Sequence, residues 1–263
     1  MNPLTVERGS VTRTWLMNFE PVNGIGPTML EALNDAVSEA VADESVAAVV
    51  LASGLDVFSA GADAKWMKGV ATSAGSDHLL ELFISTMETF RDLALRLRNS
   101  PFLVIAAMNG HTLAGGLELA AACDLRFCVR STTIKIGVPE MALFGQMPSG
   151  GGGAQFLARI LGPSRALDLI LDAGDITVDE AHRLGLVDRI VEPGQVLSFA
   201  QEYADRIAGN AGRVGVNAAK RSVFDGSAMS LTDGLQLDRA VHWDSVRRGR
   251  FAETVDAFVK KFA

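Results

Sequence analysis

The chain has 263 residues, of which 48% are hydrophobic and 21% are charged, and its formal net charge is −7. This length and apolar content suffice for one large packed core, or a core with a small appendage. Acidic and basic residues are mixed along the chain, whereas nucleic-acid binding through phosphates needs clustered lysine and arginine. Composition therefore indicates a globular protein and argues against a nucleic-acid partner.

The sequence contains no pattern for export or membrane insertion. The N-terminus lacks an apolar signal core, and the longest apolar run, FLVIAAM at 102–108, is far shorter than the roughly 18 residues that span a bilayer. Cys123 and Cys128 lie in an apolar run without metal-type spacing, so we expect buried thiols of a reducing compartment. We therefore expect a cytoplasmic protein with no membrane partner.

Strand-like and helix-like segments alternate through the first part of the chain. Apolar patterns predict strands over 11–17, 46–52, 102–108, 124–129 and 133–136, and helices that begin at Pro27 or cover 78–98 and 154–160. A polar connection is expected around 72–77. This order favours an α/β fold with crossover connections.

The last part of the chain is purely helical in pattern. From about Ser198 no strand-like run remains, and helical periodicity covers 198–208, 217–224, 231–246 and 252–262. Such helices cannot bury an apolar face alone, so they pack on the core or on a neighbouring subunit. We therefore divide the chain into a core, residues 1–197, and a helical region, residues 198–263.

Two segments of small residues, FSAGAD (58–63) and NGHTLAGGLELAAACD (109–124), each follow a strand-like run and precede a helical stretch. Glycine and alanine allow a ligand to approach the main chain, and a helix N-terminus supplies unpaired N–H donors. Two such donors facing one oxygen form an oxyanion hole. Glu118 follows Gly115 by three residues and shares its helix face, which would bring a carboxylate toward that oxygen.

Glu140 in the segment VPE is a candidate second carboxylate for the same pocket. Each glutamate has a simpler interpretation: Glu118 at the exposed edge of a tightly packed helix, and Glu140 as a first-turn carboxylate stabilised by the helix dipole. The run 150–153 consists of glycines but lacks the GK[ST] of a phosphate loop, so a close-packing turn is expected there. The histidines share no metal-ligand spacing, and we expect no metal.

Taken together, these motifs resemble the crotonase superfamily, the enoyl-CoA hydratase and isomerase group. FSAGADAKWM resembles its first oxyanion segment, NGHTLAGGLELAAACDLRF its second, IGVPEMALFGQMPSGGGGAQFLARILG its second-glutamate region, and TVDEAHRLGLVDRIV the turn before its helical tail. The resemblance covers nearly the whole chain. It implies a crotonase-like spiral of ββα units in two nearly perpendicular sheets, a C-terminal helical trimerisation region, and a homotrimer or hexamer.

The resemblance also assigns roles to residues. It implies that the N–H groups of Ala62 and Gly115 bind a thioester oxygen and that Glu118 and Glu140 are the catalytic glutamates. The expected contacts with the coenzyme A thioester are made by Ala60, Ala62, Asp63, Ala64, Lys65 and Gly115. Because coenzyme A is part of the substrate, no separate cofactor is expected.

The activity implied is enoyl-CoA hydratase, which adds water across the 2,3 double bond of a trans-2-enoyl-CoA. We assign water activation to Glu118 and acid–base chemistry at the α-carbon to Glu140. The alternatives are another reaction through the same enolate (double-bond isomerisation, decarboxylation or C–C hydrolysis) and a non-catalytic acyl-CoA-binding protein. The presence of both glutamates favours hydration, since an isomerase of the family commonly needs only one.

Three departures from the family pattern concern the substrate. The segment from Glu140 to Pro148 and the glycine run after it are each one residue longer, and Phe156 stands where relatives often carry arginine. Basic residues for the CoA phosphates are not obvious at the usual positions. The candidate substitutes are Lys65, Lys68, Lys260 and Lys261.

Overall fold

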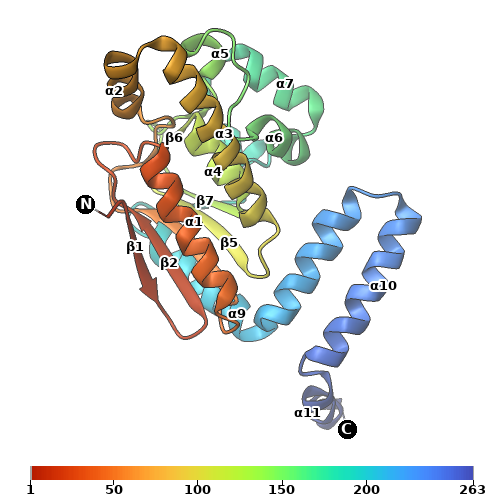
Figure 1. Ribbon diagram of the computed structural model, residues 1–263. Helices are drawn as coiled ribbons and strands as arrows, with labels where there is room; N and C mark the ends of the chain where they lie inside the picture. Colours follow the sequence, from red (N-terminus) through yellow and green to blue (C-terminus); the bar gives the residue numbers. More distant parts are fainter. Residues whose placement is uncertain (1, 263) are drawn as a thin grey trace.

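The computed structural model describes residues 2–262, which form two β-sheets and a set of helices (Figure 1). The larger sheet has the strand order β1 (Leu4–Arg8), β2 (Thr12–Met17), β3 (Ala48–Ser53), β5 (Leu103–Met108), β7 (Leu125–Val129) and β10 (Arg189–Val191). The smaller sheet contains β4 (Val57–Ser59), β6 (His111–Leu113), β8 (Ile136–Gly137) and β9 (Asp175–Ile176). Only the pairs β1·β2 and β8·β9 are antiparallel within these sheets.

The connectivity confirms the predicted spiral of ββα units. The chain passes from a strand of the larger sheet to one of the smaller sheet and then into a helix, first through β3 and β4, next through β5 and β6, and then through β7 and β8. The helices that follow are α2 (Ala64–Ala74) and α3 (Ser76–Arg98), then α4 (Gly115–Ala122), then α5 (Glu140–Leu143) and α6 (Gly153–Leu161). In each unit, the strand of the smaller sheet is followed by a helix, so the start of the helix lies near the end of that strand.

The larger sheet is covered by helices on both faces, which explains its continuous apolar strands. Every residue of β3 is buried. Val49 and Leu51 face the main core, which includes residues of α1 (Pro27–Ala42), α3 and α4, whereas Val50 faces the opposite side. That opposite side is covered by the first part of α9 (Val196–Lys220), whose Ala200 is fully buried.

The chain turns away from the core within α9. Gly212 has φ 59° and ψ 177°, which breaks the helical path between the part on the sheet and the part beyond it. The C-terminal segment (the tail, residues 213–262) then continues through a π-helical turn η1 (Arg221–Asp225), α10 (Leu231–Arg248) and α11 (Phe251–Phe262). Figure 1 shows α10 and α11 extending outward from the rest of the molecule.

Several elements were not predicted by the sequence patterns. They include the edge strand β1, the short strands β4, β6, β9 and β10, and the helices α7 (Pro163–Asp172) and α8 (Val178–Arg183). The polar segment predicted as a connection over 72–77 is mostly helical, with α2 and α3 separated at Gly75, where φ is +86°. No helix between residues 2 and 262 is long and apolar enough to span a bilayer.

The strand predicted over 133–136 is shorter than expected. Only Ile136 of that range belongs to β8, because the preceding backbone is held in a turn by a side chain. The hydroxyl of Ser131 accepts hydrogen bonds from the N–H groups of Thr133 and Ile134, at 3.1 and 3.2 Å. Local side-chain bonds of this kind compete with strand pairing.

Candidate active site

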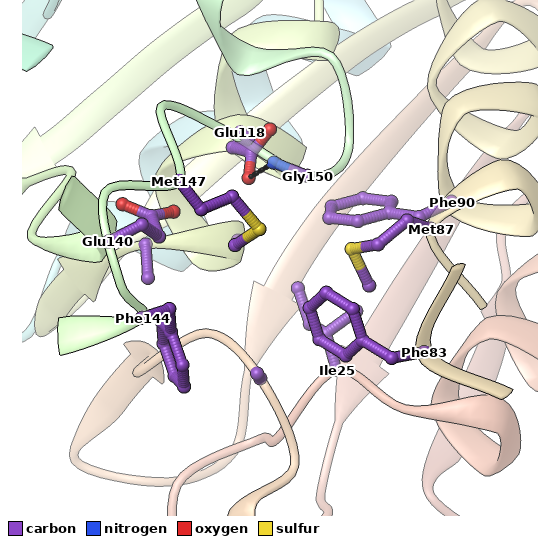
Figure 2. Close-up of a pocket in the computed structure, with 12 residues that line it drawn as sticks. Ile25, Phe83, Met87, Phe90, Glu118, Glu140, Phe144, Met147 and Gly150 are labelled. Atoms are coloured by element: carbon purple, nitrogen blue, oxygen red, sulfur yellow. Dashed lines mark hydrogen bonds between the residues drawn. The ribbon is translucent and has the colours of Figure 1, made fainter. Parts of the chain in front are cut away.

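A pocket opens where α3, α4, α5 and the glycine run 150–153 meet (Figure 2). It encloses about 340 Å³ of space, its mouth included. It is lined by Ile25, Ala62, Phe83, Met87, Phe90, Ala114, Gly115, Glu118, Glu140, Phe144, Met147 and Gly150. The structure therefore brings together the four residues to which the sequence assigned chemistry: Ala62, Gly115, Glu118 and Glu140.

The two expected donors come from different layers of the spiral. Gly115 is the first residue of α4, where a helix leaves its N–H groups unpaired. Ala62 lies in the loop between β4 and α2, which is held by hydrogen bonds from Ile25 N to Gly61 O (2.7 Å) and from Asp63 N to Ile25 O (3.0 Å). Within the described part of the chain, neither the Ala62 N–H nor the Gly115 N–H donates to another protein group.

Small residues are required where these two segments meet. A Cβ on Gly61 would lie 2.5 Å from the Cβ of Ala114 and 3.1 Å from the nitrogen of Gly115, and φ at Gly61 is +94°. A Cβ on Gly116 would lie 2.4 Å from the carbonyl oxygen of Ser59. These glycines let the donor-bearing loop approach the start of α4, since any side chain would separate the segments.

Ala114 has an unusual backbone conformation immediately before the Gly115 donor. Its φ is 52° and its ψ is −131°, a region that residues with a Cβ rarely adopt. Its N–H donates to the carbonyl oxygen of Gly137 at 2.9 Å, which ties the start of α4 to β8. Backbone strain of this kind costs on the order of 1–3 kcal/mol and is concentrated at functional sites.

Glu118 is 2% exposed and is held by donors from the loop that carries the glycine run. Its Oε2 accepts from Ser149 Oγ at 2.8 Å, Gly151 N at 2.8 Å and Gly153 N at 2.6 Å, and its Oε1 accepts from Gly150 N at 3.2 Å. Charge-assisted donors to both oxygens fix the orientation of the carboxylate. The interpretation that placed Glu118 at an exposed helix edge is wrong.

The glycine run packs closely, as expected, but it also binds an anion from within the chain. A Cβ on Gly153 would lie 2.5 Å from Cγ of Glu118, and one on Gly151 would lie 2.3 Å from the ring of Phe90. Sequence reasoning missed this role of Ser149 and the glycine N–H groups. The available signal was a run of glycines leading into a helix, which presents unpaired donors to a carboxylate.

Glu140 has the opposite environment at the first residue of α5. It is 3% exposed, and neither carboxyl oxygen has a hydrogen-bond partner among the described residues. Burial, the main cause, raises the pKa of Glu140 to about 8, and the nearby Glu118 carboxylate contributes in the same direction. Glu140 is therefore mostly protonated at neutral pH.

The other walls of the pocket are apolar. Phe83, Met87 and Phe90 lie on one face of α3, at positions i, i+4 and i+7, opposite the glutamates in Figure 2. Phe144 and Met147 complete the lining. Sequence periodicity could not distinguish this face of α3 from ordinary core. Between apolar walls, N–H donors interact more strongly with a developing charge than they would in bulk water.

The remaining residues of the expected CoA set lie outside the lining. Ala60, Ala64 and Lys65 are exposed, and the N–H of Ala60 donates to Val22 O at 3.1 Å. The carboxylate of Asp63 accepts from Trp66 N at 3.0 Å and caps α2. Their contacts with CoA stay a prediction. Among residues 2–262, no group of three or more His, Cys, Asp or Glu side chains is arranged to hold a metal ion.

Comparisons with known proteins agree with this architecture. A family model described as enoyl-CoA hydratase/isomerase matches residues 7–263. The short-chain-enoyl-CoA hydratase of Clostridium acetobutylicum is 32% identical over 261 residues, which cover 99% of this chain and 95% of that protein. The enoyl-CoA isomerase/hydratase fer4 of Mycosarcoma maydis is 32% identical over 88% of this chain and 81% of its own length. The crystal structure of an enoyl-CoA hydratase from Bacillus anthracis matches with a TM-score of 0.87 and 28% identity, covering 98% of this chain and 96% of that one.

Proposed function

The chain belongs to the enoyl-CoA hydratase/isomerase family, and from this premise we propose that it adds water reversibly across the 2,3 double bond of a trans-2-enoyl-CoA to give a 3-hydroxyacyl-CoA. One observation carries the proposal. One largely apolar pocket places two buried carboxyl groups beside two backbone N–H groups that have no acceptor among residues 2–262.

The N–H groups of Ala62 and Gly115 bind the thioester oxygen. As negative charge develops on this oxygen, the two donors stabilise the enolate, and each donor of this type contributes roughly 3–4 kcal/mol in measured cases. Withdrawal of electrons toward the oxygen makes the β-carbon electrophilic. Because the donors are fixed by α4 and by the clamped loop at Ile25, the site needs little reorganisation when the charge forms.

The two glutamates then divide the proton transfers. Within the described part of the chain, Oε1 of Glu118 accepts one hydrogen bond, from Gly150 N, and it has capacity to accept another from a water molecule. The water oxygen attacks the β-carbon while Glu118 takes a proton from the water. Protonated Glu140 gives its proton to the α-carbon. The water thus supplies the hydroxyl group. The pair finishes with its one proton on Glu118, and transfer back to Glu140 through solvent restores the starting state.

The coenzyme A part of the substrate lies along the exposed segment at the start of α2. This segment contains Ala60, Asp63, Ala64 and Lys65 together with the pocket residue Ala62. Backbone groups of the small residues can approach the ligand closely, and the Lys65 ammonium supplies a positive charge for a phosphate. Coenzyme A enters as part of the substrate, and the chemistry described requires no separate cofactor.

The tail supports an assembly of several copies. Leu231, Leu235 and Trp243 of α10 are exposed on a helix that extends away from the core (Figure 1). An exposed apolar helix face of this kind is normally covered by a partner. The assembly proposed is a homotrimer or a hexamer made of two trimers. A cytoplasmic location fits the free, buried Cys123 and Cys128.

Double-bond isomerisation is the second candidate. A single carboxyl group can move a proton between the α- and γ-carbons, and neither oxygen of Glu140 has a hydrogen-bond partner among the residues that the structure describes. The relative from Mycosarcoma maydis carries both activities in its name. Hydration differs in needing a second group to activate water, and Glu118 lines the same pocket.

The test follows the ultraviolet absorbance of the conjugated thioester with crotonyl-CoA and with an aromatic enoyl-CoA. Hydration removes the conjugation and increases the product mass by one water, whereas isomerisation leaves the mass unchanged. Glu140→Gln is the control and should slow the loss by about 100-fold or more. A wild-type protein that binds both thioesters tightly but converts neither is a binding protein, and the hydratase proposal then fails.

A further inference from the structure

Helix α4 runs from the pocket to the C-terminal end of α3, where Arg98 contacts its last turn. Its first residue is the Gly115 donor, it carries Glu118, and all eight of its residues are buried. A helix of this length is about 12 Å long and moves as a rigid unit inside a close-packed core. The groups that hold its last turn therefore also influence where Gly115 and Glu118 lie.

Arg98 links the end of α4 to the tail. Its Nη2 donates to the carbonyl oxygens of Ala121 at 2.8 Å and Cys123 at 3.2 Å, and carbonyls at a helix C-terminus need such partners from outside the helix. The same guanidinium lies 4.2 Å from the ring centroid of Phe224 in η1 and 5.4 Å from that of Phe156 in α6. Contacts at these distances are cation–π interactions. Phe224 is thus the tail residue that contacts Arg98, the side chain that binds the carbonyl groups at the end of α4.

Lys220, the last residue of α9, makes a second link. Its ammonium lies 2.8 Å from Oδ2 of Asp124, which follows α4 by two residues, and it also donates to Phe102 O at 2.9 Å. The side chains of Lys220 and Asp124 are 7% and 4% exposed. The same Asp124 oxygen accepts from Val104 N of β5 at 2.7 Å. This buried ion pair therefore fixes the tail, the end of α4 and the central sheet to one another.

These links are made by the long side chains of Arg98 and Lys220. An opening of about 590 Å³ lies beside them, between the end of α3 and the tail, lined by Arg98, Asn99, Ser100, Asn217, Lys220, Arg221, Phe224 and Asp225. The π-helical turn 221–225 also gives Phe224 a register that a continuing α-helix would not, and such turns are frequent at functional sites.

We propose that Lys220 and Phe224 of the tail are positioning residues that hold α4 where the Gly115 N–H meets the thioester oxygen. The inference rests on the proposed role of Gly115 as an oxyanion donor. Displacing a reacting group by about 1 Å can lower the rate on the order of 100-fold. A shift of α4 would therefore lower turnover although every reacting group is still present. The contacts of the tail with the core thereby affect the turnover rate of the same chain.

The test measures carbonyl polarisation directly. In a Glu140→Gln background, a bound aromatic enoyl-CoA keeps its double bond, and two N–H donors on its carbonyl oxygen shift its ultraviolet band to longer wavelength. Adding Lys220→Met should reduce this shift by at least about half, and in the otherwise wild-type protein the same change should lower kcat by about tenfold or more with a smaller change in KM. Phe224→Ala should act in the same direction.

Two features keep the test decisive if Lys220→Met folds poorly. Phe224→Ala leaves no buried charge unpaired, and Nη1 of Arg126 still donates to Cys123 O at 3.0 Å, so the end of α4 keeps a core-side contact. Arg221→Ala is the matched control, because Arg221 lies in the same turn but pairs with Asp225 at 3.7 Å. It should leave the shift and kcat unchanged.

The outcomes separate this inference from the proposed function. A melting temperature that falls in Lys220→Met and Phe224→Ala, with an unchanged band shift and unchanged kcat, shows a purely structural role and overturns the inference. A wild-type protein that shifts the band but does not hydrate overturns the hydratase proposal alone, and the variants still decide the positioning role. Absence of any band shift in Glu140→Gln with Lys220 and Phe224 intact overturns the donor assignment and the inference together.

Discussion

Glu118 and Glu140 line one pocket in opposite hydrogen-bonding environments. The carboxylate of Glu118 accepts four hydrogen bonds from the segment 149–153, whereas neither oxygen of Glu140 has a protein partner among the described residues. Two carboxyl groups in one apolar site favour a state that carries a single proton between them. The contrast assigns that proton to Glu140 at neutral pH, where the pKa of Glu140 is raised to about 8.

Hydratase activity should fall as pH rises through the pKa of Glu140, about 8, because the pair then loses its single proton. Hydration and dehydration should lose activity over the same pH range, because the pair of glutamates holds one proton both before and after the reaction. The measurement is kcat/KM for crotonyl-CoA between about pH 6 and pH 10. A flat profile over that range contradicts the assignment of Glu140 as the acid.

Replacement of Glu140 by Gln should make stability less dependent on pH. In the folded protein the pKa is about 8 instead of its usual 4.5, so between these values the unfolded chain has lost a proton that the folded protein keeps. Wild-type stability therefore declines as pH rises through this window and levels off above it. Relative to wild type, Glu140→Gln should gain on the order of 1–3 kcal/mol between about pH 5 and pH 8, measured by urea unfolding. The exposed Glu81→Gln on α3 is the control and should show no such trend.

Replacement of Glu118 by Gln should instead destabilise the protein. Gly151 N, Gly153 N and the Ser149 hydroxyl donate to Oε2, whereas Gly150 N donates to Oε1, so in either orientation the NH2 group of an amide faces at least one N–H donor. The expected loss is about 1–3 kcal/mol by denaturant unfolding, with turnover reduced by about 100-fold or more. Equal stability of Glu118→Gln and wild type would show that the loop does not depend on the carboxylate.

Gly153→Ala should disturb catalysis through Glu118. The added Cβ would lie 2.5 Å from Cγ and 2.8 Å from Oε2 of Glu118, so the carboxylate has to move. We expect kcat to fall by about tenfold or more and stability to fall by roughly 1–3 kcal/mol. Gly69→Ala on α2 is the matched control, because its Cβ meets no atom within 4 Å, and it should be neutral or slightly stabilising. Wild-type kcat in Gly153→Ala would refute the need for close packing here.

Ala114→Gly should stabilise the fold by about 1 kcal/mol, because glycine tolerates φ 52° and ψ −131° without the strain imposed by a Cβ. The Gly115 donor is retained, so hydratase activity should change little. Ala120→Gly, in the interior of the same helix, is the comparison and should lose about 1 kcal/mol or more. If thermal unfolding shows the same loss for both variants, the Ala114 backbone is not strained.

The local patterns of the sequence predicted the central strands of the larger sheet, an α/β fold and the candidate carboxylates, whereas the spiral of ββα units was implied by the family resemblance. Strands such as β3 and β5 were predictable because burial on both faces requires an unbroken apolar run. The small residues before α4 predicted accessible N–H donors because glycine and helix starts have that property in any context. These features depend only on neighbouring residues, which is why they can be read without a structure.

Tertiary structure alone decided how the reacting groups behave. The donors to Glu118 come from residues more than 30 positions later, and the raised pKa of Glu140 results from burial by several separate elements. Lys220 pairs with Asp124 just after α4 and bonds Phe102 O across 118 positions of sequence, so these links have no local signature. The local sequence determines which chemical groups are available, whereas desolvation and long-range pairing, which set protonation and position, exist only after distant segments have packed together.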